Sequence, residues 1–105
     1  EMIFFRVHDL DRLQAGYKGI REPAPDGERF CYKDCMEEQI LMLMPGVAFD
    51  AEKARMGYGK GFYDRFLSDK PQLARRTIAI GHRCQLVEKI PCEDTDIRPA
   101  KVICV

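Results

Sequence analysis

The sequence lacks an excess of charge of either sign, a long apolar run and a signal peptide. Its 105 residues carry 17 acidic and 17 basic side chains, which gives a formal net charge of +0. A balanced charge gives no indication of a nucleic-acid or anionic-membrane partner. No apolar stretch approaches the roughly 20 residues that span a bilayer, and residues 1–7 lack a basic leader and a cleavage site. We therefore expect neither a nucleic-acid nor a membrane partner.

Closely spaced cysteine pairs are also missing. No two of the five cysteines have CxxC spacing, and the two histidines do not complete a set of four zinc ligands. An odd number of unpaired thiols is typical of a reducing compartment, so we expect reduced cysteines and a cytoplasmic protein. The cysteines are Cys31, Cys35, Cys84, Cys92 and Cys104.

What is present is typical of one small globular domain. Apolar residues make up 46% of the chain and charged residues 32%, which is ordinary for such a protein. The length predicts a single domain over residues 1–105.

The apolar pattern predicts strands that alternate with short helices. The run over 40–44 ends at Pro45-Gly46 and is expected to be a strand buried on both faces, as is 77–81. A helix is predicted over 62–67 and a helical turn with an Asp9 cap over 8–13. Further strands are predicted over 2–7 and 102–105, loops or connectors over 16–26, 51–56 and 73–76, and a turn or short helix over 85–89, while the type of 30–38 stays open. This order indicates an α/β fold with an open sheet, whose ligands lie at the carboxyl ends of the strands.

Three glycines stand at alternate positions in the run Gly57-Tyr58-Gly59-Lys60-Gly61. Glycine allows positive φ and close approach of the backbone, so that successive N–H groups and the start of the following helix can face an anion. Arg55 and Lys60 add positive charge that suits a polyphosphate. The run matches neither the Walker A loop nor the dinucleotide fingerprint, and the glycines alone describe a flexible turn equally well.

A longer string resembles the signature of the 5-formyltetrahydrofolate cyclo-ligase family. It consists of Pro45-Gly46-Val47-Ala48-Phe49-Asp50 followed by Arg55-x-Gly57-Tyr58-Gly59-Lys60-Gly61-Phe62-Tyr63-Asp64-Arg65-Phe66-Leu67. Gly19-Ile20-x-Glu22-Pro23 and Ile90-Pro91-x-Glu93-x-x-Asp96 resemble the flanking segments of the family. The resemblance covers nearly the whole chain.

This resemblance implies a reaction that uses ATP and Mg²⁺. Family members phosphorylate the formyl oxygen of 5-formyltetrahydrofolate with ATP, and N10 then closes the ring to 5,10-methenyltetrahydrofolate as phosphate leaves. Positioning and charge neutralisation should dominate such a reaction. The implied fold is an open, mainly parallel sheet with flanking helices and an isomerase- or CoA-transferase-like topology.

The resemblance also assigns roles to individual residues, all given in the numbering of this chain. Lys60 and Tyr63 are implied as catalytic residues, and Asp64 and Asp96 as the Mg²⁺ ligands. Glu22 is implied to bind folate together with the loop residues Tyr58, Gly59, Lys60, Gly61 and Phe62. The implied ATP-binding residues are Arg55, Gly57, Tyr58, Gly59, Lys60, Gly61, Phe62 and Tyr63.

Each assignment has a purely structural alternative. Asp64 can be a carboxylate in the first turn of a helix, Asp96 a solvated loop acid and Glu22 a surface residue. Phe62 or Tyr63 can be a core aromatic. His8 and His82 match no catalytic position of the family.

The chain departs from the family in its length. Family members are longer and begin with a helical part that helps to bind ATP and folate, so we expect this chain to correspond to the C-terminal part of the fold. We also expect poor turnover by the chain alone, and self-association through the apolar sheet surface left exposed. Two alternatives are a non-catalytic module that binds nucleotide or folate, and, less well matched, a relative of sugar-phosphate isomerases.

Overall fold

The chain consists of two units, Glu1–Asp34 and Cys35–Val105, each of which is described here by itself. The structure is a computed structural model that describes residues 2–32 and 40–105. Most of the segment 30–38, whose type the sequence leaves open, and Cys35 lie outside the described residues. The single domain expected over 1–105 stays a prediction.

The first unit contains short elements that depend on local hydrogen bonds. A 3₁₀ turn over Leu10–Arg12 begins after Asp9, whose side chain accepts a hydrogen bond from the Asp11 N–H at 2.9 Å. This confirms the predicted helical turn and its cap. The strand predicted over 2–7 is wrong, because the structure gives this segment only an isolated bridge between Phe5 and Arg29.

Glu22 lies on a short strand of the first unit. β1 (Gln14–Ala15) pairs antiparallel with β2 (Arg21–Glu22), and a second 3₁₀ turn, Tyr17–Gly19, connects them. The predicted loop over 16–26 therefore contains a strand, although Glu22 is extended, as the following proline predicts.

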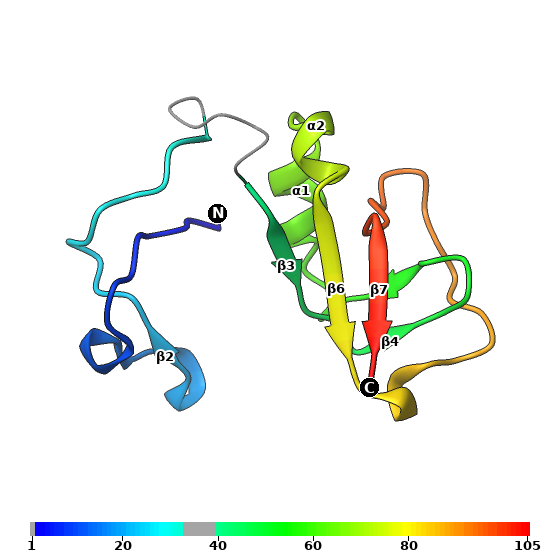
Figure 1. Ribbon diagram of the computed structural model, residues 1–105, viewed down its shortest axis with the longest axis horizontal. Coiled ribbons are helices and arrows are strands. Elements are labelled where there is room, and N and C mark those ends of the chain that lie inside the picture. Colours follow the sequence, from blue (N-terminus) through cyan, green and yellow to red (C-terminus); the bar gives the residue numbers. More distant parts are fainter. Residues whose placement is uncertain (1, 33–39) are drawn as a thin grey trace. The chain divides into compact units, whose positions relative to one another are not determined.

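A parallel sheet forms the centre of the second unit. It consists of β3 (Met42–Met44), β6 (Thr77–Gly81) and β7 (Lys101–Cys104) in the order β3-β6-β7. Both strand pairs are parallel, so each connection must cross from one end of the sheet to the other. α1 (Phe62–Leu67) and α2 (Pro71–Ala74) lie in the first of these connections (Figure 1). The predicted α/β fold with an open, mainly parallel sheet is confirmed.

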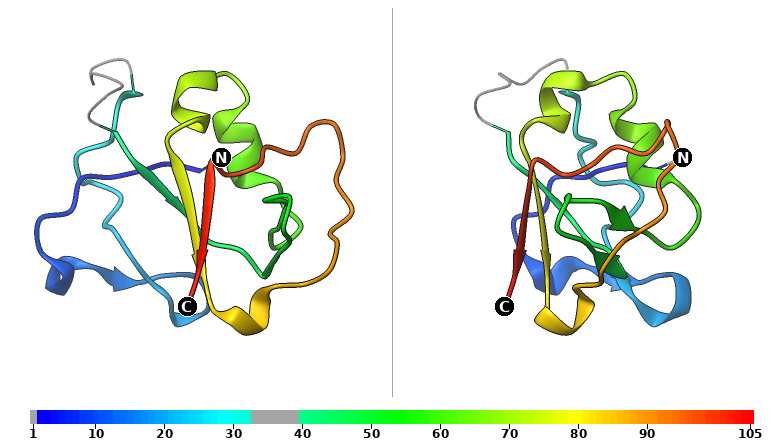
Figure 2. Two further views of the ribbon diagram at one scale, coloured as in Figure 1. Left: turned by 45° about the vertical axis from the view of Figure 1, so that its right-hand side comes forward. Right: turned by 90° about the vertical axis from the view of Figure 1, so that its right-hand side faces the viewer.

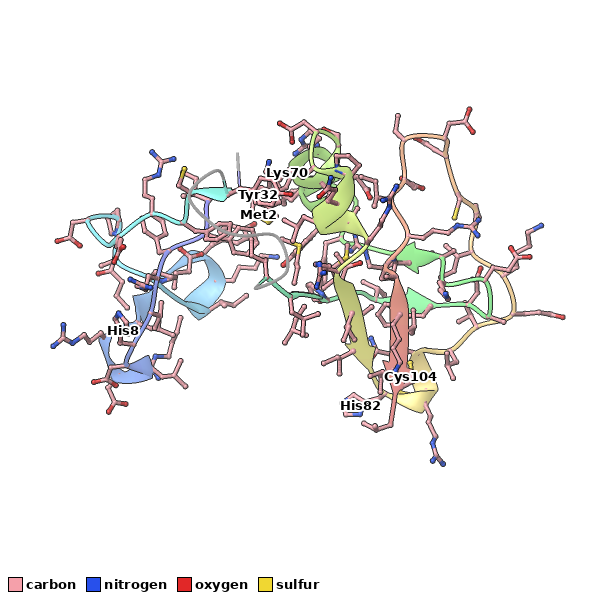
Figure 3. The ribbon with its side chains drawn as sticks, turned by 45° about the horizontal axis from the view of Figure 1, so that its top comes forward. Met2, His8, Tyr32, Lys70, His82 and Cys104 are labelled. Carbon is pink, nitrogen blue, oxygen red and sulfur yellow. The ribbon has the colours of Figure 1, made fainter. Side chains whose placement is uncertain are left out.

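The two helices bury one leucine each. Leu67 of α1 and Leu73 of α2 are both only 1% exposed. Between the helices, the Lys70 ammonium donates to the Phe66 carbonyl at 2.9 Å (Figure 3). α1 has the predicted bounds, whereas α2 replaces part of the predicted connector over 73–76. None of the helices in the described part of the chain has the length and apolar character that a membrane span requires.

Within the described part of the second unit, helices cover one face of the sheet. Met42 and Met44 of β3 are buried, and Figure 2 shows α1 and α2 on one side of the sheet. On the opposite face, Leu41, Leu43 and Ile80 are 61%, 58% and 49% exposed. The prediction that 40–44 and 77–81 are buried on both faces is therefore wrong for the residues described, because alternate side chains point to opposite faces and the helices cover one.

A β-hairpin follows the sheet strand β3. β4 (Ala48–Phe49) pairs antiparallel with β5 (Arg55–Met56), where the sequence predicts a polar connector. Phe49 is completely buried, and its carbonyl accepts a hydrogen bond from the Val87 N–H at 2.8 Å. The hairpin is therefore held by tertiary contacts as well as by its own short ladder.

Gln85 connects the carboxyl ends of β3 and β6. It ends a 3₁₀ turn, Arg83–Gln85, which shares only Gln85 with the turn or short helix predicted over 85–89. Its amide nitrogen donates to the Gly46 carbonyl at 2.8 Å, and its amide oxygen accepts from the His82 N–H at 2.7 Å. His82 itself lies at the end of β6 (Figure 3). These bonds fix the turn that leads from β3 into the hairpin.

A matched pair of leucines tests which face of the sheet is covered. Leu73→Ala should lower the free energy of unfolding by about 2–5 kcal/mol, because it leaves a cavity in the core. Leu43→Ala should lower it by less than about 1 kcal/mol, because its side chain is already exposed. Urea denaturation of both variants measures the two values, and an equal or larger loss at Leu43 would show that its face is covered.

Candidate functional site

A cleft of about 680 Å³ lies beside the glycine-rich loop, entirely within the second unit. One wall is formed by β5, the glycine-rich loop and the first residues of α1. The other wall is formed by the acidic segment 90–96, which begins at Ile90 and contributes Glu93 and Asp96 to the lining. Pro45, directly after β3, also lines it, so the turn at the carboxyl end of that strand lies at the cleft. The principal polar and glycine residues of the lining are Arg55, Gly57, Gly59, Lys60, Gly61, Asp64, Arg65, Glu93 and Asp96. This volume is within the range of small-molecule sites.

The glycine-rich loop has the conformation that its glycines allow. Gly59 and Gly61 have φ values of 88° and 63°, which strain any residue with a Cβ atom. A Cβ at Gly57 would lie 3.0 Å from an Arg55 guanidinium nitrogen. Among the described residues, the N–H groups of Tyr58 and Gly59 donate no hydrogen bond. Two residues that line the cleft therefore have main-chain donors available for a ligand.

Arg55 forms a buried positive centre in the cleft wall. Its side chain is only 7% exposed, and its guanidinium donates to the Pro45 carbonyl at 3.0 Å. The guanidinium lies 3.9 Å from an Asp64 oxygen and 5.3 Å from the centre of the Tyr63 ring. Its Nε atom is buried without a hydrogen-bond partner among the described residues. An unmade bond of this kind costs about 1–3 kcal/mol, so an incoming acceptor would be stabilised here.

The two predicted metal ligands, Asp64 and Asp96, line the same cleft. Asp64 Oδ1 accepts a hydrogen bond from the Ile97 N–H at 2.9 Å, and Asp96 Oδ2 accepts one from the Glu93 N–H at 2.9 Å. Because Ile97 follows Asp96 directly, the first bond brings the two acids close together. Each carboxylate thus has one oxygen held by the main chain and a second oxygen with no bond in the described residues.

Asp64 also has a structural role, which the sequence analysis gave as the alternative to metal binding: it is a carboxylate in the first turn of a helix. It lies in the first turn of α1, and its bond to Ile97 joins this helix to the acidic segment. This contact spans 33 residues of sequence, and no local pattern predicts it.

Lys60 and Tyr63, predicted as catalytic, both line the cleft. The Lys60 carbonyl accepts a hydrogen bond from the Arg65 guanidinium, which braces the loop against α1. Burial raises the pKa of the Tyr63 phenol, and the nearby Arg55 charge opposes this rise only in part. Tyr63 is therefore a protonated hydrogen-bond donor at neutral pH.

Glu22 is not one of the residues of this cleft. It belongs to the first unit, where a Cβ at Gly16 would lie 2.3 Å from its carboxyl carbon. Close packing of its side chain over Gly16 thus explains the glycine there. The contact of Glu22 with folate stays a prediction.

Neither histidine lines the cleft, and in residues 2–32 and 40–105 no cluster of three or more His, Cys, Asp or Glu side chains could hold a metal. A two-carboxylate site is still compatible with Mg²⁺, which usually takes one or two carboxylates and completes its shell with phosphates and waters. Among the described residues, Cys31, Cys84, Cys92 and Cys104 form no disulfide bond.

Comparison with known proteins identifies the family. The model of the 5-formyltetrahydrofolate cyclo-ligase family matches residues 1–105. The chain is 36% identical to a probable 5-formyltetrahydrofolate cyclo-ligase of Caenorhabditis elegans, over 97% of this chain and 52% of that protein. It is 35% identical to the 5-formyltetrahydrofolate cyclo-ligase of Escherichia coli K12, over 91% of this chain and 51% of that protein.

The chain belongs to the 5-formyltetrahydrofolate cyclo-ligase family. It spans about half the length of the curated relatives that it matches. The predicted resemblance is confirmed, and the string that carries it, 45–67, forms the turn after β3, the hairpin, the glycine-rich loop and α1.

One important residue of this family member was not predicted from its pattern. Asp50 stands in the family string, but the sequence analysis gives it no role. It is only 4% exposed, and its carboxylate accepts hydrogen bonds from the N–H groups of Glu52, Ala54 and Ile90, each at 2.9 Å. An acid directly after an apolar strand and five residues before a second strand is the signal that could have indicated this turn.

Because of these hydrogen bonds, the free energy of unfolding of this chain should fall in acid, where Asp50 becomes protonated. The hydrogen bond from the Ile90 N–H lowers the pKa of Asp50 below its ordinary value of 3.8, although burial raises it in part. The hydrogen bonds from the Ala54 and Glu52 N–H groups and the positive charge of Arg98 lower the pKa further. A lowered folded-state pKa stabilises the fold above the unfolded-state value, and this contribution is lost as the pH falls through the folded-state pKa. Asp50→Asn should therefore be less stable than the wild type at pH 7, with a difference that narrows below about pH 4.

Urea denaturation between pH 2.5 and pH 7 measures this difference. Glu88→Gln is the matched control, because Glu88 is exposed and lies near the same segment. A constant difference between wild type and Asp50→Asn over the whole pH range would contradict the ionised, hydrogen-bonded state of Asp50.

Proposed function

We propose that this chain takes part in the ATP- and Mg²⁺-dependent conversion of 5-formyltetrahydrofolate to 5,10-methenyltetrahydrofolate. ATP transfers its terminal phosphoryl group to the formyl oxygen, N10 attacks the activated carbon, and inorganic phosphate leaves as the ring closes. The observation that carries the proposal is a cleft that combines a glycine-rich loop, a buried arginine and two neighbouring carboxylates. Membership of the family supports the same reaction.

The donors of the cleft fit a polyphosphate. The main-chain N–H groups at Tyr58 and Gly59 and the unpartnered Nε of Arg55 are oriented hydrogen-bond donors, and Lys60 adds charge at the same wall. Donors that are held in place before the reaction lose little freedom when the phosphates bind. We propose ATP binding by Arg55 and by the loop from Gly57 through Phe62 to Tyr63.

The carboxylates fit Mg²⁺ as a partner of the phosphates. Asp64 and Asp96 would hold it through the oxygens that the main chain leaves unbonded, with phosphate oxygens and water completing an octahedral shell. When bound, Mg²⁺ neutralises the charge that develops on the transferred phosphoryl group. The protein's part is to hold Asp64, at the start of α1, and Asp96, on the facing segment, beside Arg55 and the loop.

Lys60 of the loop and Tyr63 of α1 are proposed to act on the reacting groups. Lys60 would neutralise the phosphoryl oxygens, and Tyr63, whose raised pKa keeps it protonated, would donate a hydrogen bond there. The folate would contact the loop from Tyr58 to Phe62, with Glu22 binding the N–H groups of its pterin. This arrangement brings the formyl oxygen and the terminal phosphate to the same loop.

The cellular setting belongs to the same proposal. We propose a cytoplasmic protein of one-carbon metabolism. Self-association is supported by the exposed apolar face of the sheet, which is formed by Leu41, Leu43, Ile80, Ile103 and Val105.

Replacement of one carboxylate tests the magnesium site. Asp64→Asn should weaken binding of MgATP by about tenfold or more, because it removes a charged oxygen ligand. Binding of ATP without Mg²⁺ should not weaken, because asparagine keeps an acceptor for the Ile97 N–H and the change removes a charge that repels the phosphates. Calorimetric titration measures both affinities.

Asp69→Asn is the matched control, since Asp69 lies just beyond α1, is 77% exposed and forms an ion pair with Lys70 outside the cleft. Equal MgATP affinities for Asp64→Asn and Asp69→Asn would exclude Asp64 as a magnesium ligand.

Turnover distinguishes an enzyme from a binding module. The absorbance of 5,10-methenyltetrahydrofolate should rise when MgATP and 5-formyltetrahydrofolate are added to the chain, and the rate should fall in Asp64→Asn. Poor turnover by the chain alone stays a prediction, to be compared with that of a full-length relative. Binding of both ligands with no product would instead favour the non-catalytic module.

A further inference from the structure

The two walls of the cleft come from segments that are far apart in the sequence. β5 and the glycine-rich loop lie near residues 55–61, and the acidic wall lies over 90–96. The metal-binding role proposed for the acids requires a fixed spacing between these walls. The contacts that set this spacing lie outside the cleft, at the turn of the β4–β5 hairpin.

One oxygen of Asp50 shapes the hairpin. Oδ1 accepts hydrogen bonds from the N–H groups of Glu52 and Ala54, both at 2.9 Å. The main chain closes the same turn, because the Lys53 N–H donates to the Asp50 carbonyl at 3.1 Å. Arg55 follows this turn directly, so the direction in which the chain enters the glycine-rich loop depends on Asp50.

The other oxygen of Asp50 holds the acidic wall. Oδ2 accepts the N–H of Ile90 at 2.9 Å, across 40 residues of sequence. Ile90 is 4% exposed and packs in a core cluster with Ala48 and Ala54. It is the first residue of the acidic wall, which therefore starts from a point fixed to the hairpin.

The far end of the acidic wall returns to the same turn. The Arg98 guanidinium donates to the Glu52 carbonyl at 3.1 Å, and the Ile97 N–H donates to Asp64 at 2.9 Å. The segment 90–98 is thus attached at its start to Asp50 and at its end to Glu52 and α1. The part of this segment that lines the cleft begins at Ile90 and ends at Asp96.

We infer that Asp50 is a positioning residue, whose carboxylate sets the spacing between the glycine-rich loop and the acidic wall that carries Asp96. The inference rests on the proposed function, and Asp50 itself touches no reacting group. A carboxylate is needed because both oxygens must accept: an asparagine can keep the Oδ1 bonds of the turn, but its NH₂ group would face the Ile90 N–H. Asp50→Asn therefore cuts the connection between the walls and spares the hairpin turn.

Amide hydrogen exchange of the unliganded 105-residue chain tests the connection. In Asp50→Asn, protection should fall at least about tenfold at Ile90 and also at Glu93 and Ile97, whose N–H groups bind Asp96 and Asp64, because local opening governs their exchange. Protection at Ala54 should change less. Glu88→Gln, an exposed acid-to-amide change close to the same wall, should leave all four amides as in the wild type.

Calorimetric titration tests the effect on the site. Mg²⁺ should raise the affinity of the wild type for ATP, and in Asp50→Asn we expect this increase to be about tenfold smaller. A loss of this size is typical of residues that orient metal ligands. The affinity for ATP without Mg²⁺ should be nearly the same in both proteins. A merely destabilised fold would weaken both affinities by the same factor.

The outcomes separate this inference from the proposed function. If the wild type binds no MgATP, the proposed function fails, and the exchange data still decide whether Asp50 holds the acidic wall. Unchanged protection at Glu93 and Ile97 in Asp50→Asn would overturn the inference. So would an unchanged Mg²⁺-dependent gain in a variant that remains folded by circular dichroism.

Discussion

The site depends on a buried carboxylate that joins two segments 40 residues apart. The Asp50 carboxylate accepts three hydrogen bonds of 2.9 Å from main-chain N–H groups, two from its own turn and one from Ile90. A buried carboxylate is stable only when such donors satisfy it, so the turn and the acidic segment support each other. Without this connection, the start of the segment 90–96 would be released from the hairpin, and, among the described residues, only the contacts of Ile97 and Arg98 would hold the segment.

The cleft that results has charge of both signs. Arg55 and Lys60 lie on the loop side, and Asp96 faces them from the acidic segment, with Asp64 at the start of α1 between the two. A bare anion would be repelled by the acids and a bare cation by the arginine. A polyphosphate that carries a divalent cation matches both the basic and the acidic side chains. The Nε–H of Arg55, which has no hydrogen-bond partner among the described residues, is a further donor for the phosphate oxygens.

The sequence predicted the parts of this structure that depend on local patterns. The bounds of α1 and β6 agree with the predictions over 62–67 and 77–81, because apolar spacing and flanking glycine or proline determine them. The hairpin was missed, since its two-residue strands depend on Phe49 and Asp50 making contacts near residues 87–90. Burial on both faces of the sheet was wrongly predicted from apolar runs, which report the hydrophobicity of a strand but not what covers it. The loop and the acids of the site were found through the family string, whereas Asp50 shows its role only in three dimensions.

The central claim is that the glycine-rich loop and Arg55 hold the phosphates of ATP. Nuclear magnetic resonance of the ¹⁵N-labelled chain during a MgATP titration tests it most directly, because each N–H group reports its own hydrogen bond. The account predicts that the largest shifts occur at the amides of Tyr58 and Gly59 and at the Arg55 Nε–H, which gain an acceptor. Saturable binding that leaves these three signals unchanged and shifts others would contradict it.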